Sequence, residues 1–290
     1  MKPASFHYLS PTNIQDALAM LGENGPDTRL LAGGQSLVPM MNFRLARPTV
    51  LIDLNRIPDL SYICDGGDHL SIGAMTRERT IENSDLVRDT TPVLHDATLQ
   101  IGHLPIRSRG TIGGSIANAD PAAEYPATML ALDATLIAKS LRGERRIDAA
   151  DFFEGVLSTT LAPDEILTEI IVPKTPRTAG GAFVELSRRQ GDFALAGVAA
   201  QIEFDGEAII NVRLAACGVG AAPVRLSKSE SVILAHGLSE NGLSTAERAA
   251  RAEVDPDGDV HATADYRRKL AGVMTKRALL KAAERAPRTR

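Results

Sequence analysis

The chain has 290 residues, 44% of them hydrophobic and 23% charged, which is enough for two or three domains with their own cores and excludes disorder as the default. A formal net charge of -4 and an aromatic content of 4% without tryptophan argue against a nucleic-acid-binding surface, which needs excess basic charge and stacking side chains. No signal-peptide pattern and no apolar run of membrane-spanning length is present, so we expect a cytoplasmic protein.

The two cysteines, Cys64 and Cys217, lie far apart and match no zinc or iron–sulfur spacing. In a chain of this length they are expected to be buried free thiols in a reducing compartment. No metal site is therefore expected in this chain.

The first third of the chain mixes helices and strands. Ser10 and Pro11 form a cap-then-proline signal for a helix whose apolar stripe starts at Ile14 and that ends at Gly22. We then expect a strand over 28–32, a short helix over 36–44, and strands over 49–54 and 69–75.

The remainder divides at a proline- and glycine-rich stretch. Asp120 and Pro121 repeat the cap signal for a helix reaching residue 132, and strands follow over 134–139 and 167–172. Residues 173–181 are the best linker candidate. Beyond it we expect strands over 181–186, 194–204 and 208–220, and a helix over 265–283 with Tyr266, Leu270, Val273 and Leu280 facing inward.

Two glycine pairs stand in similar surroundings, Gly33–Gly34 and Gly113–Gly114. Each follows a short apolar or β-branched run and precedes a serine and an expected helix. A glycine pair permits positive φ angles and close approach of a ligand, and successive amide N–H groups there can bind an anion. Two such loops would suit a pyrophosphate, although a lone pair of glycines is usually just a tight turn.

Other motifs give weaker signals. The segment 218–223 begins like a dinucleotide fingerprint but has Pro223 where the third glycine belongs, and no lysine-bearing phosphate loop exists. The six histidines show no metal-binding spacing, and the acidic segment 255–259 lacks the glutamate of a calcium loop. We assign no catalytic residue.

Five segments in one order carry a family resemblance: AGGQSLVPMM, TIGGSIANADPAAEYPA, SRRQGDFALAGVAA, GVGAAPVRL and ADYRRKLAGVMTKRAL. Together they resemble the FAD-binding medium subunit of molybdenum hydroxylases. The likeness is strongest to the carbon monoxide dehydrogenase type within the xanthine dehydrogenase family, which also serves bacterial dehydrogenases of N-heteroaromatic compounds. It spans essentially the whole chain.

The resemblance implies an α+β fold. An FAD-binding domain of the vanillyl-alcohol-oxidase (PCMH) type is expected over residues 1–175, with subdomains at about 1–55 and 56–175. A C-terminal domain like that of the CO dehydrogenase flavoproteins, with a three-stranded antiparallel sheet and helices, is expected over 178–290.

The resemblance also implies the residues that bind FAD. The two loops would hold its pyrophosphate, residues near the second loop would line the adenosine and phosphate side, and others would lie near the flavin ring. In that order they are Ala32, Gly33, Gly34, Gln35, Ser36 and Leu37 with Thr111, Ile112, Gly113, Gly114 and Ser115; then Asn118, Asp120 and Glu124; then Leu167, Asp192 and Phe193.

Two of these residues depart from the family pattern. Phe193 stands where relatives carry tyrosine beside the isoalloxazine, so stacking can persist while a hydrogen bond is lost. Gln35 stands where many relatives have histidine, which keeps hydrogen bonding but removes a titrating group.

The family resemblance implies partners. A large subunit holds the molybdopterin cofactor and hydroxylates the substrate, and a small subunit with two [2Fe-2S] clusters passes electrons to FAD in this chain and on to an external acceptor. A dimer of heterotrimers is expected, either free in the cytoplasm or peripheral at the inner membrane face through the complex. A stand-alone FAD-dependent oxidase and a structural subunit that has lost FAD are the alternatives.

Overall fold

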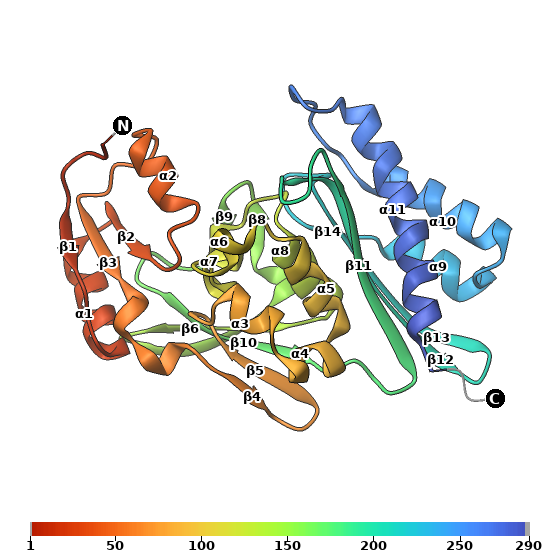
Figure 1. Cartoon of the computed structure of the whole chain (residues 1–290), viewed down its shortest axis with the longest axis horizontal. Coiled ribbons are helices and arrows are strands. Elements are labelled where there is room, and N and C mark those ends of the chain that lie inside the picture. The colour runs from red at the N-terminus through yellow and green to blue at the C-terminus, as the bar shows by residue number, and fades with distance from the viewer. Residues whose placement is uncertain (1, 288–290) are drawn as a thin grey trace.

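The computed structural model describes residues 2–287, which form three main β-sheets that follow one another along the chain (Figure 1). The first sheet is parallel, with the strand order β1-β3-β2. Its core lies where Ala17, Leu18 and Leu21 of α1 meet Val50 and Ile52 of β3. The elements are β1 (His7–Leu9), α1 (Ile14–Asn24), β2 (Thr28–Leu31), α2 (Leu37–Asn42) and β3 (Val50–Asp53), followed by turns of 3-10 helix at Leu54–Arg56 and Pro58–Leu60.

The first helix begins later and runs further than the sequence signals indicate. Asn13, not Ser10, is its N-cap, and the Asn13 side chain accepts a hydrogen bond from Asp16 N at 2.9 Å. The helix continues past Gly22 to Asn24 and ends at Gly25, whose φ of 75° is in the left-handed region. The expected boundaries were wrong because an asparagine cap and a positive-φ glycine outcompeted nearby weaker signals.

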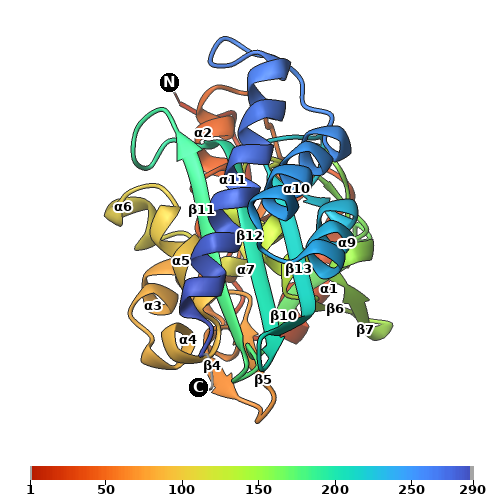
Figure 2. The ribbon, with the colours of Figure 1, turned by 90° about the vertical axis from the view of Figure 1, so that its right-hand side faces the viewer.

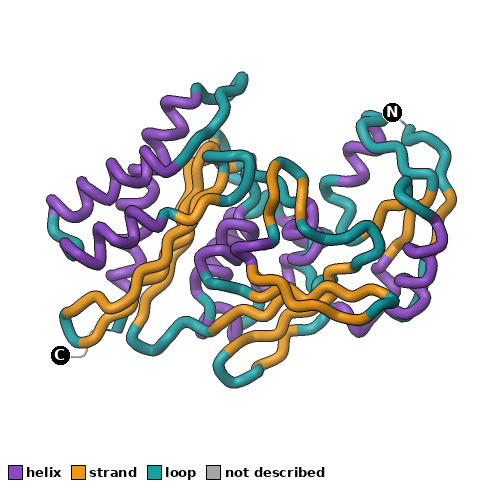
Figure 3. Tube along the Cα trace, turned by 180° about the vertical axis from the view of Figure 1, so that it is seen from behind, coloured by secondary structure: helices purple, strands orange, loops and turns teal. Residues whose placement is uncertain are grey.

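The second sheet is antiparallel, with the order β4-β5-β10-β6-β7, and helices α3 to α8 cover one of its faces (Figure 1). Figure 3 shows this sheet from behind. The strands are β4 (Ile63–Asp65), β5 (His69–Gly73), β6 (Thr135–Ser140), β7 (Gly143–Asp148) and β10 (Ile166–Pro173), with a separate pair β8 (Phe153–Gly155) and β9 (Ser158–Thr159) after a 3-10 turn at Ala149–Asp151.

The helices over the second sheet are short. They are α3 (Glu78–Glu82), α4 (Asp85–Thr90), α5 (Pro92–Gln100), α6 (Leu104–Arg107), α7 (Ile112–Asn118) and α8 (Glu124–Ala131). The helix expected from Asp120 begins instead at Glu124, because Asp120 accepts from Ala122 N and closes a turn rather than capping a helix. Its residues Tyr125 to Ala131 are all buried.

The third sheet contains the three long antiparallel strands expected and a fourth of two residues. They are β11 (Ala179–Ser187), β12 (Ala194–Asp205), β13 (Ala208–Cys217) and β14 (Val224–Arg225). Helices α9 (Ser227–His236), α10 (Glu240–Glu253) and α11 (Ala264–Arg285) cover its outer face (Figure 2). The other face packs on α5 and α8.

The inward face of α11 differs from the expected one. Leu270 is buried, but Tyr266 and Leu280 are exposed and Val273 is only partly buried. The rest of the buried stripe consists of the small residues Ala271, Ala278 and Ala282 together with Met274 and Leu279. Small side chains let α11 lie close to the sheet, which hydrophobicity alone does not reveal.

Polar contacts fasten the third sheet to the second. Asp96 of α5 accepts hydrogen bonds from Arg285 of α11 at 2.6 Å and from Phe183 N of β11 at 3.3 Å. Gly218 N donates to Pro121 O at 2.7 Å, and Arg225 donates to Leu130 O at 3.0 Å. These contacts hold the third sheet against the helices over the second sheet, and they thereby fix the position of the turn that joins β11 to β12.

Two further sequence expectations concern exposure. Cys217 is buried as expected, but Cys64 is exposed, because it lies on β4 at the edge of the second sheet.

Among residues 2–287, no helix combines the length and the apolar character that crossing a membrane requires.

Candidate cofactor-binding site

Residues 32–36, here called loop one, connect β2 to α2. Gly34 has a φ of 74°, a conformation that residues with a side chain rarely adopt. Gly33 is packed against the chain at residues 109–110, and a Cβ there would lie 2.4 Å from Arg109 O. Both glycines are therefore required by the path of the backbone, one for its φ angle and one for the close approach.

Loop one presents unused hydrogen-bond donors. Within residues 2–287, the amide N–H groups of Gly33, Gly34, Gln35 and Ser36 have no protein acceptor. Ser36 is the N-cap of α2, yet its hydroxyl makes no capping bond. Successive free N–H groups around a left-handed glycine are typical of an anion-binding concavity.

Residues 109–115, here called loop two, are built differently. Gly113 and Gly114 lie inside the first turn of α7, whose N-cap is Thr111, rather than in a turn before a helix. Gly113 N donates to Ala74 O at 2.9 Å, and Gly114 N donates to Thr111 Oγ1 at 3.1 Å. The amides expected here as a second anion cradle are thus already used within the protein.

The glycines of loop two serve close packing instead. A Cβ on Gly113 would lie 2.4 Å from the Ala74 Cβ, and one on Gly114 would lie 3.2 Å from the Ala32 Cβ of loop one. Because loop two also contacts Gly33, the two loops form one continuous surface at the junction of the first and second sheets (Figure 1). The structure brings together the two segments that the sequence analysis paired.

The remaining predicted residues near loop two divide into accessible and buried ones. The side chains of Ser115 and Asn118 are partly exposed and, within the described chain, have no protein hydrogen-bond partner. Asp120 accepts from Ala122 N at 2.9 Å. Ile112 and Leu167 are buried, so only their backbones or edges can face a ligand.

Glu124 belongs to a buried acidic cluster. Its side chain is 5% exposed, and burial raises its pKa to about 7. Burial, assisted by the charge of Glu124, raises the pKa of Glu78 and of Glu185 to about 8 each. In residues 2–287, Oε2 of Glu78 and Oε2 of Glu185 are buried without a hydrogen-bond partner. Neither Glu78 nor Glu185 had a sequence signal, because each sits in an ordinary helical or strand pattern.

Asp192 and Phe193 lie in the turn between β11 and β12. Gly191 in this turn has a φ of 86°, and a Cβ there would lie 2.4 Å from Cε1 of His103, so the turn rests on the start of α6. Phe193 is 64% exposed, which leaves its ring free to stack against a planar group.

Sequence reasoning missed a set of polar residues behind the loops. Asn55 Nδ2 donates to Ala32 O at 2.9 Å, and the Arg77 side chain donates to Arg109 O. Asp53 accepts a hydrogen bond from Asn55 N, and Tyr8 donates a hydrogen bond to Asp53. The only available signal was that Asp53 ends a buried strand and Asn55 follows it, whereas Arg77 had no signal.

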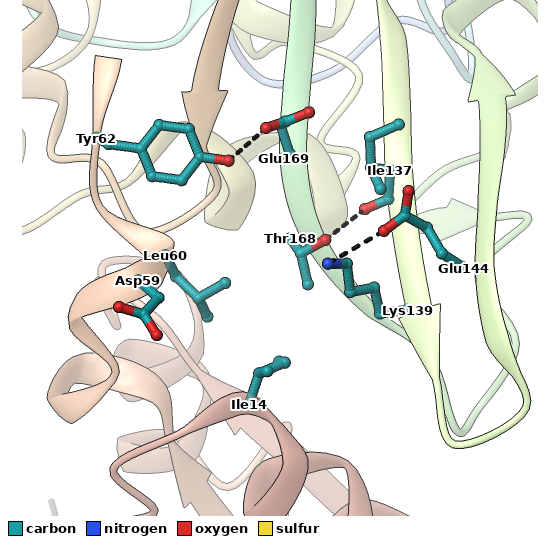
Figure 4. A pocket seen from close by; sticks show the side chains of 9 residues that line it. All are labelled: Ile14, Asp59, Leu60, Tyr62, Ile137, Lys139, Glu144, Thr168 and Glu169. Atoms are coloured by element: carbon teal, nitrogen blue, oxygen red, sulfur yellow. Dashed lines mark hydrogen bonds and ion pairs between the residues drawn. The ribbon is translucent and has the colours of Figure 1, made fainter. Parts of the chain in front are cut away.

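A separate cavity of about 170 Å³ lies between α1 and the second sheet (Figure 4). Tyr62 donates to Glu169 there, and Lys139 pairs with Glu144 at 3.1 Å. None of its lining residues belongs to loop one or loop two. The hydroxyls of Tyr62 and Thr168 and the Lys139 ammonium group already donate to acceptors within the protein, so the cavity adds no free donors to the site.

Replacing Glu78 with glutamine should stabilise the protein at alkaline pH. The pKa of Glu78 is about 8 in the folded state and 4.5 in the unfolded state, so the carboxyl costs no stability below pH 4.5. Stability is then lost progressively as the pH rises to 8, and the loss is complete above that value. Glutamine does not titrate, so the free energy of unfolding of the variant relative to the parent should rise by roughly 5 kcal/mol from acid to alkaline pH. Urea unfolding across this pH range measures the difference.

Glu82→Gln is the matched control. Hydrogen bonds from Arg107 lower the pKa of Glu82, so this variant should lose stability above the ordinary glutamate pKa and match the parent below it. A Glu78→Gln difference that stays constant with pH would contradict titration of Glu78 inside the fold.

Comparison with known proteins identifies two families along the chain. The FAD binding domain in molybdopterin dehydrogenase matches residues 4–175, and the CO dehydrogenase flavoprotein C-terminal domain matches residues 181–282. These two matches cover most of the chain and confirm the family resemblance and the α+β fold expected from the sequence.

Relatives match over nearly their full lengths. The chain is 39% identical to the 6-hydroxypseudooxynicotine dehydrogenase complex subunit alpha of Paenarthrobacter nicotinovorans, covering 100% of this chain and 98% of the relative. It is 39% identical to the caffeine dehydrogenase subunit beta of Pseudomonas sp. (strain CBB1), covering 98% and 97%. A carbon monoxide dehydrogenase structure from Hydrogenophaga pseudoflava, which lacks the Mo-pyranopterin moiety, superposes with a TM-score of 0.97 at 38% identity over 99% of this chain and 100% of that one.

Sequence, fold and the joined glycine loops therefore lead to one conclusion: the chain belongs to the family of FAD-binding subunits of molybdopterin dehydrogenases, with the C-terminal domain of the CO dehydrogenase flavoproteins.

Proposed function

We propose that this chain is the FAD-carrying relay of a molybdenum hydroxylase complex. It would take electrons from [2Fe-2S] clusters of a small subunit and pass them to an external acceptor, while a separate molybdenum subunit hydroxylates the substrate. The observation that carries the proposal is the contact between loop one and loop two, which unites free amide donors and two glycine pairs in a chain of this family.

The residues present fit FAD. Four free amides of loop one can donate to the diphosphate, and Gly33 and Gly114 leave no side chain where the two loops meet. We propose that loop one, residues 32–36 with Leu37, binds the diphosphate directly. Residues 111–115 of loop two would form the opposite wall. When bound, FAD supplies the exchange of one or two electrons, and the chain supplies orientation and charge environment.

The other predicted residues would flank the diphosphate. We propose that Asn118 and Asp120 line the adenosine and phosphate side and that Glu124 supports this wall from its buried position. Leu167, Asp192 and Phe193 would lie toward the flavin ring. The exposed Phe193 would offer a stacking face without the hydroxyl that relatives carry.

Partners and domain limits are part of the same proposal. The relatives are named as subunits or medium chains of dehydrogenases, which supports a multi-subunit assembly. We propose a large molybdenum subunit and a small iron–sulfur subunit, arranged as a dimer of heterotrimers in the cytoplasm or at the inner membrane face. The domain division at 1–175 and 178–290 stays a prediction, supported by the family matches and by the change of sheet after β10.

Gly33→Ala should sharply weaken FAD binding. The added Cβ would lie 2.4 Å from Arg109 O, so loop one must move away from loop two. We expect the FAD dissociation constant to rise at least about a hundredfold, because several charge-assisted hydrogen bonds to the diphosphate are lost together. Flavin fluorescence during dilution of the assembled complex measures the release of FAD.

Gly22→Ala provides the matched control for this substitution. Gly22 lies within α1, and its added Cβ would meet only Leu141 Cδ1 at 3.9 Å, so FAD binding should be unchanged and α1 slightly stabilised. Retention of parental FAD affinity in Gly33→Ala would contradict the assignment of loop one.

The relay itself is tested by purifying the complex from its native host and mixing it with substrate. Iron–sulfur bands should bleach before the flavin band, and complexes lacking the small subunit should leave FAD oxidised. Direct reduction of the isolated yellow chain by an organic substrate would contradict the relay and favour a stand-alone oxidase. A colourless chain would indicate a structural subunit.

A further inference from the structure

Asn55 and Arg77 link the two loops through side chains. Asn55 Nδ2 donates to Ala32 O in loop one at 2.9 Å, and Arg77 Nη2 donates to Asn55 Oδ1 at 2.5 Å. Arg77 Nη1 donates to Arg109 O in loop two. The path Ala32–Asn55–Arg77–Arg109 is here called the bracket.

The loop-one end of the bracket is anchored in the first sheet. Asp53, the last residue of β3 and 9% exposed, accepts from Asn55 N at 2.9 Å and also from Asn55 Nδ2. Tyr8 in β1 donates to Asp53 Oδ2 at 2.5 Å. Asn55 itself is exposed to water, so its orientation depends on this support from Asp53.

The loop-two end of the bracket is attached through the backbone around Arg77. The Arg77 backbone forms a bridge with Thr111, and its neighbours bond the same segment: Ile112 N donates to Thr76 O at 3.1 Å and Glu78 N donates to Gly110 O at 3.0 Å. Arg77 is therefore part of the support of loop two and reaches across to the first sheet with its guanidinium group.

No hydrogen bond joins loop one directly to loop two within residues 2–287. The glycine contacts set how close the loops can come, but van der Waals contact alone does not hold them there. The hydrogen bonds of the bracket supply the attraction between the two loops. They also give the carbonyl oxygens of Ala32 and Arg109 hydrogen-bond donors, beside the proposed site for the FAD diphosphate.

We infer that Asn55 and Arg77 are positioning residues that set the spacing of the two loops and thereby the affinity and geometry of bound FAD. The inference rests on the proposed assignment of the loops to the FAD diphosphate. It adds to the proposed site two residues that hydrogen-bond to the loop carbonyls, Asn55 and Arg77, and the positive charge of Arg77.

The test uses Asn55→Asp, Asn55→Ala, Arg77→Lys and Arg77→Ala in the assembled complex. Asn55→Asp keeps an acceptor for Arg77 but has no donor for Ala32 O. Arg77→Lys has no planar guanidinium group, so it cannot bond Asn55 Oδ1 and Arg109 O in the geometry that arginine uses. Each single variant should release FAD about ten- to a hundredfold faster, with Arg77→Lys milder than Arg77→Ala. The double alanine variant should release FAD no faster than the worse single variant, because both break one bracket.

Two readouts separate positioning from general stability. The visible circular dichroism of bound flavin should change in the bracket variants, while the midpoint of urea unfolding measured without FAD should stay near the parent value. Controls are Asn83→Ala, which removes one exposed bond to Arg79 O at the end of α3, and Arg79→Ala on the same helix. Both controls should bind FAD as the parent does.

The inference is overturned if the bracket variants hold FAD within twofold of the parent, or if FAD release rises only in step with lost folding stability. If Gly33→Ala loses FAD while the bracket variants keep it, only the bracket fails. If Gly33→Ala also keeps FAD, the assignment of the loops fails.

Discussion

The site depends on how closely two stretches of backbone approach each other. Gly33 packs so closely against the Arg109 carbonyl and Gly110 that a side chain has no room there, and Gly114 packs tightly against the Ala32 side chain. Loop one follows a strand of the first sheet, and loop two is carried by helices over the second sheet. This contact makes two segments that are far apart in sequence into one continuous surface.

The two loops contribute unequally to that surface. Loop one has free amides around a left-handed glycine, while the amides of loop two are bonded within the protein. The third sheet completes the arrangement, because Asp96 and the Gly218–Pro121 bond hold it against α5 and α8. The turn that carries Phe193 rests on His103 at the start of α6, the helix that precedes loop two.

Local signals predicted the central strands of the three sheets and the helices α1, α2, α8 and α11, but not the edge strands β1, β4, β7 and β14, most of the other helices or the details that build the site. The predicted strands coincide with runs of β-branched and apolar residues, whereas the edge strand β7 has the polar sequence GERRID. Gly206, with a φ of 60°, lies in the hairpin turn between β12 and β13. Helix ends were less certain because Ser10, Asn13, Gly22 and Gly25 all compete as signals, and only tertiary packing decides among them. The glycines of loop two were predicted by motif but not in their role, because their partner Ala74 lies in a separate segment.

Long-range polar contacts could not be predicted at all. Asn55 and Arg77 meet across two sheets, and the buried acids Glu78, Glu124 and Glu185 come from three elements. Neither periodicity nor spacing in one sequence encodes such pairings. The family resemblance indicated the cofactor, and the contacts in the structure are the basis on which we infer the residues that position it.

A structure of the complex with bound FAD would test the central claim most directly. The distances from the diphosphate oxygens to the amide nitrogens of Gly33, Gly34, Gln35 and Ser36 are the quantities to measure. The account predicts that at least two are near 3 Å, with Asn55 and Arg77 still joining Ala32 to Arg109 behind the diphosphate. A diphosphate held elsewhere, with these amides bonded only to water, would contradict it.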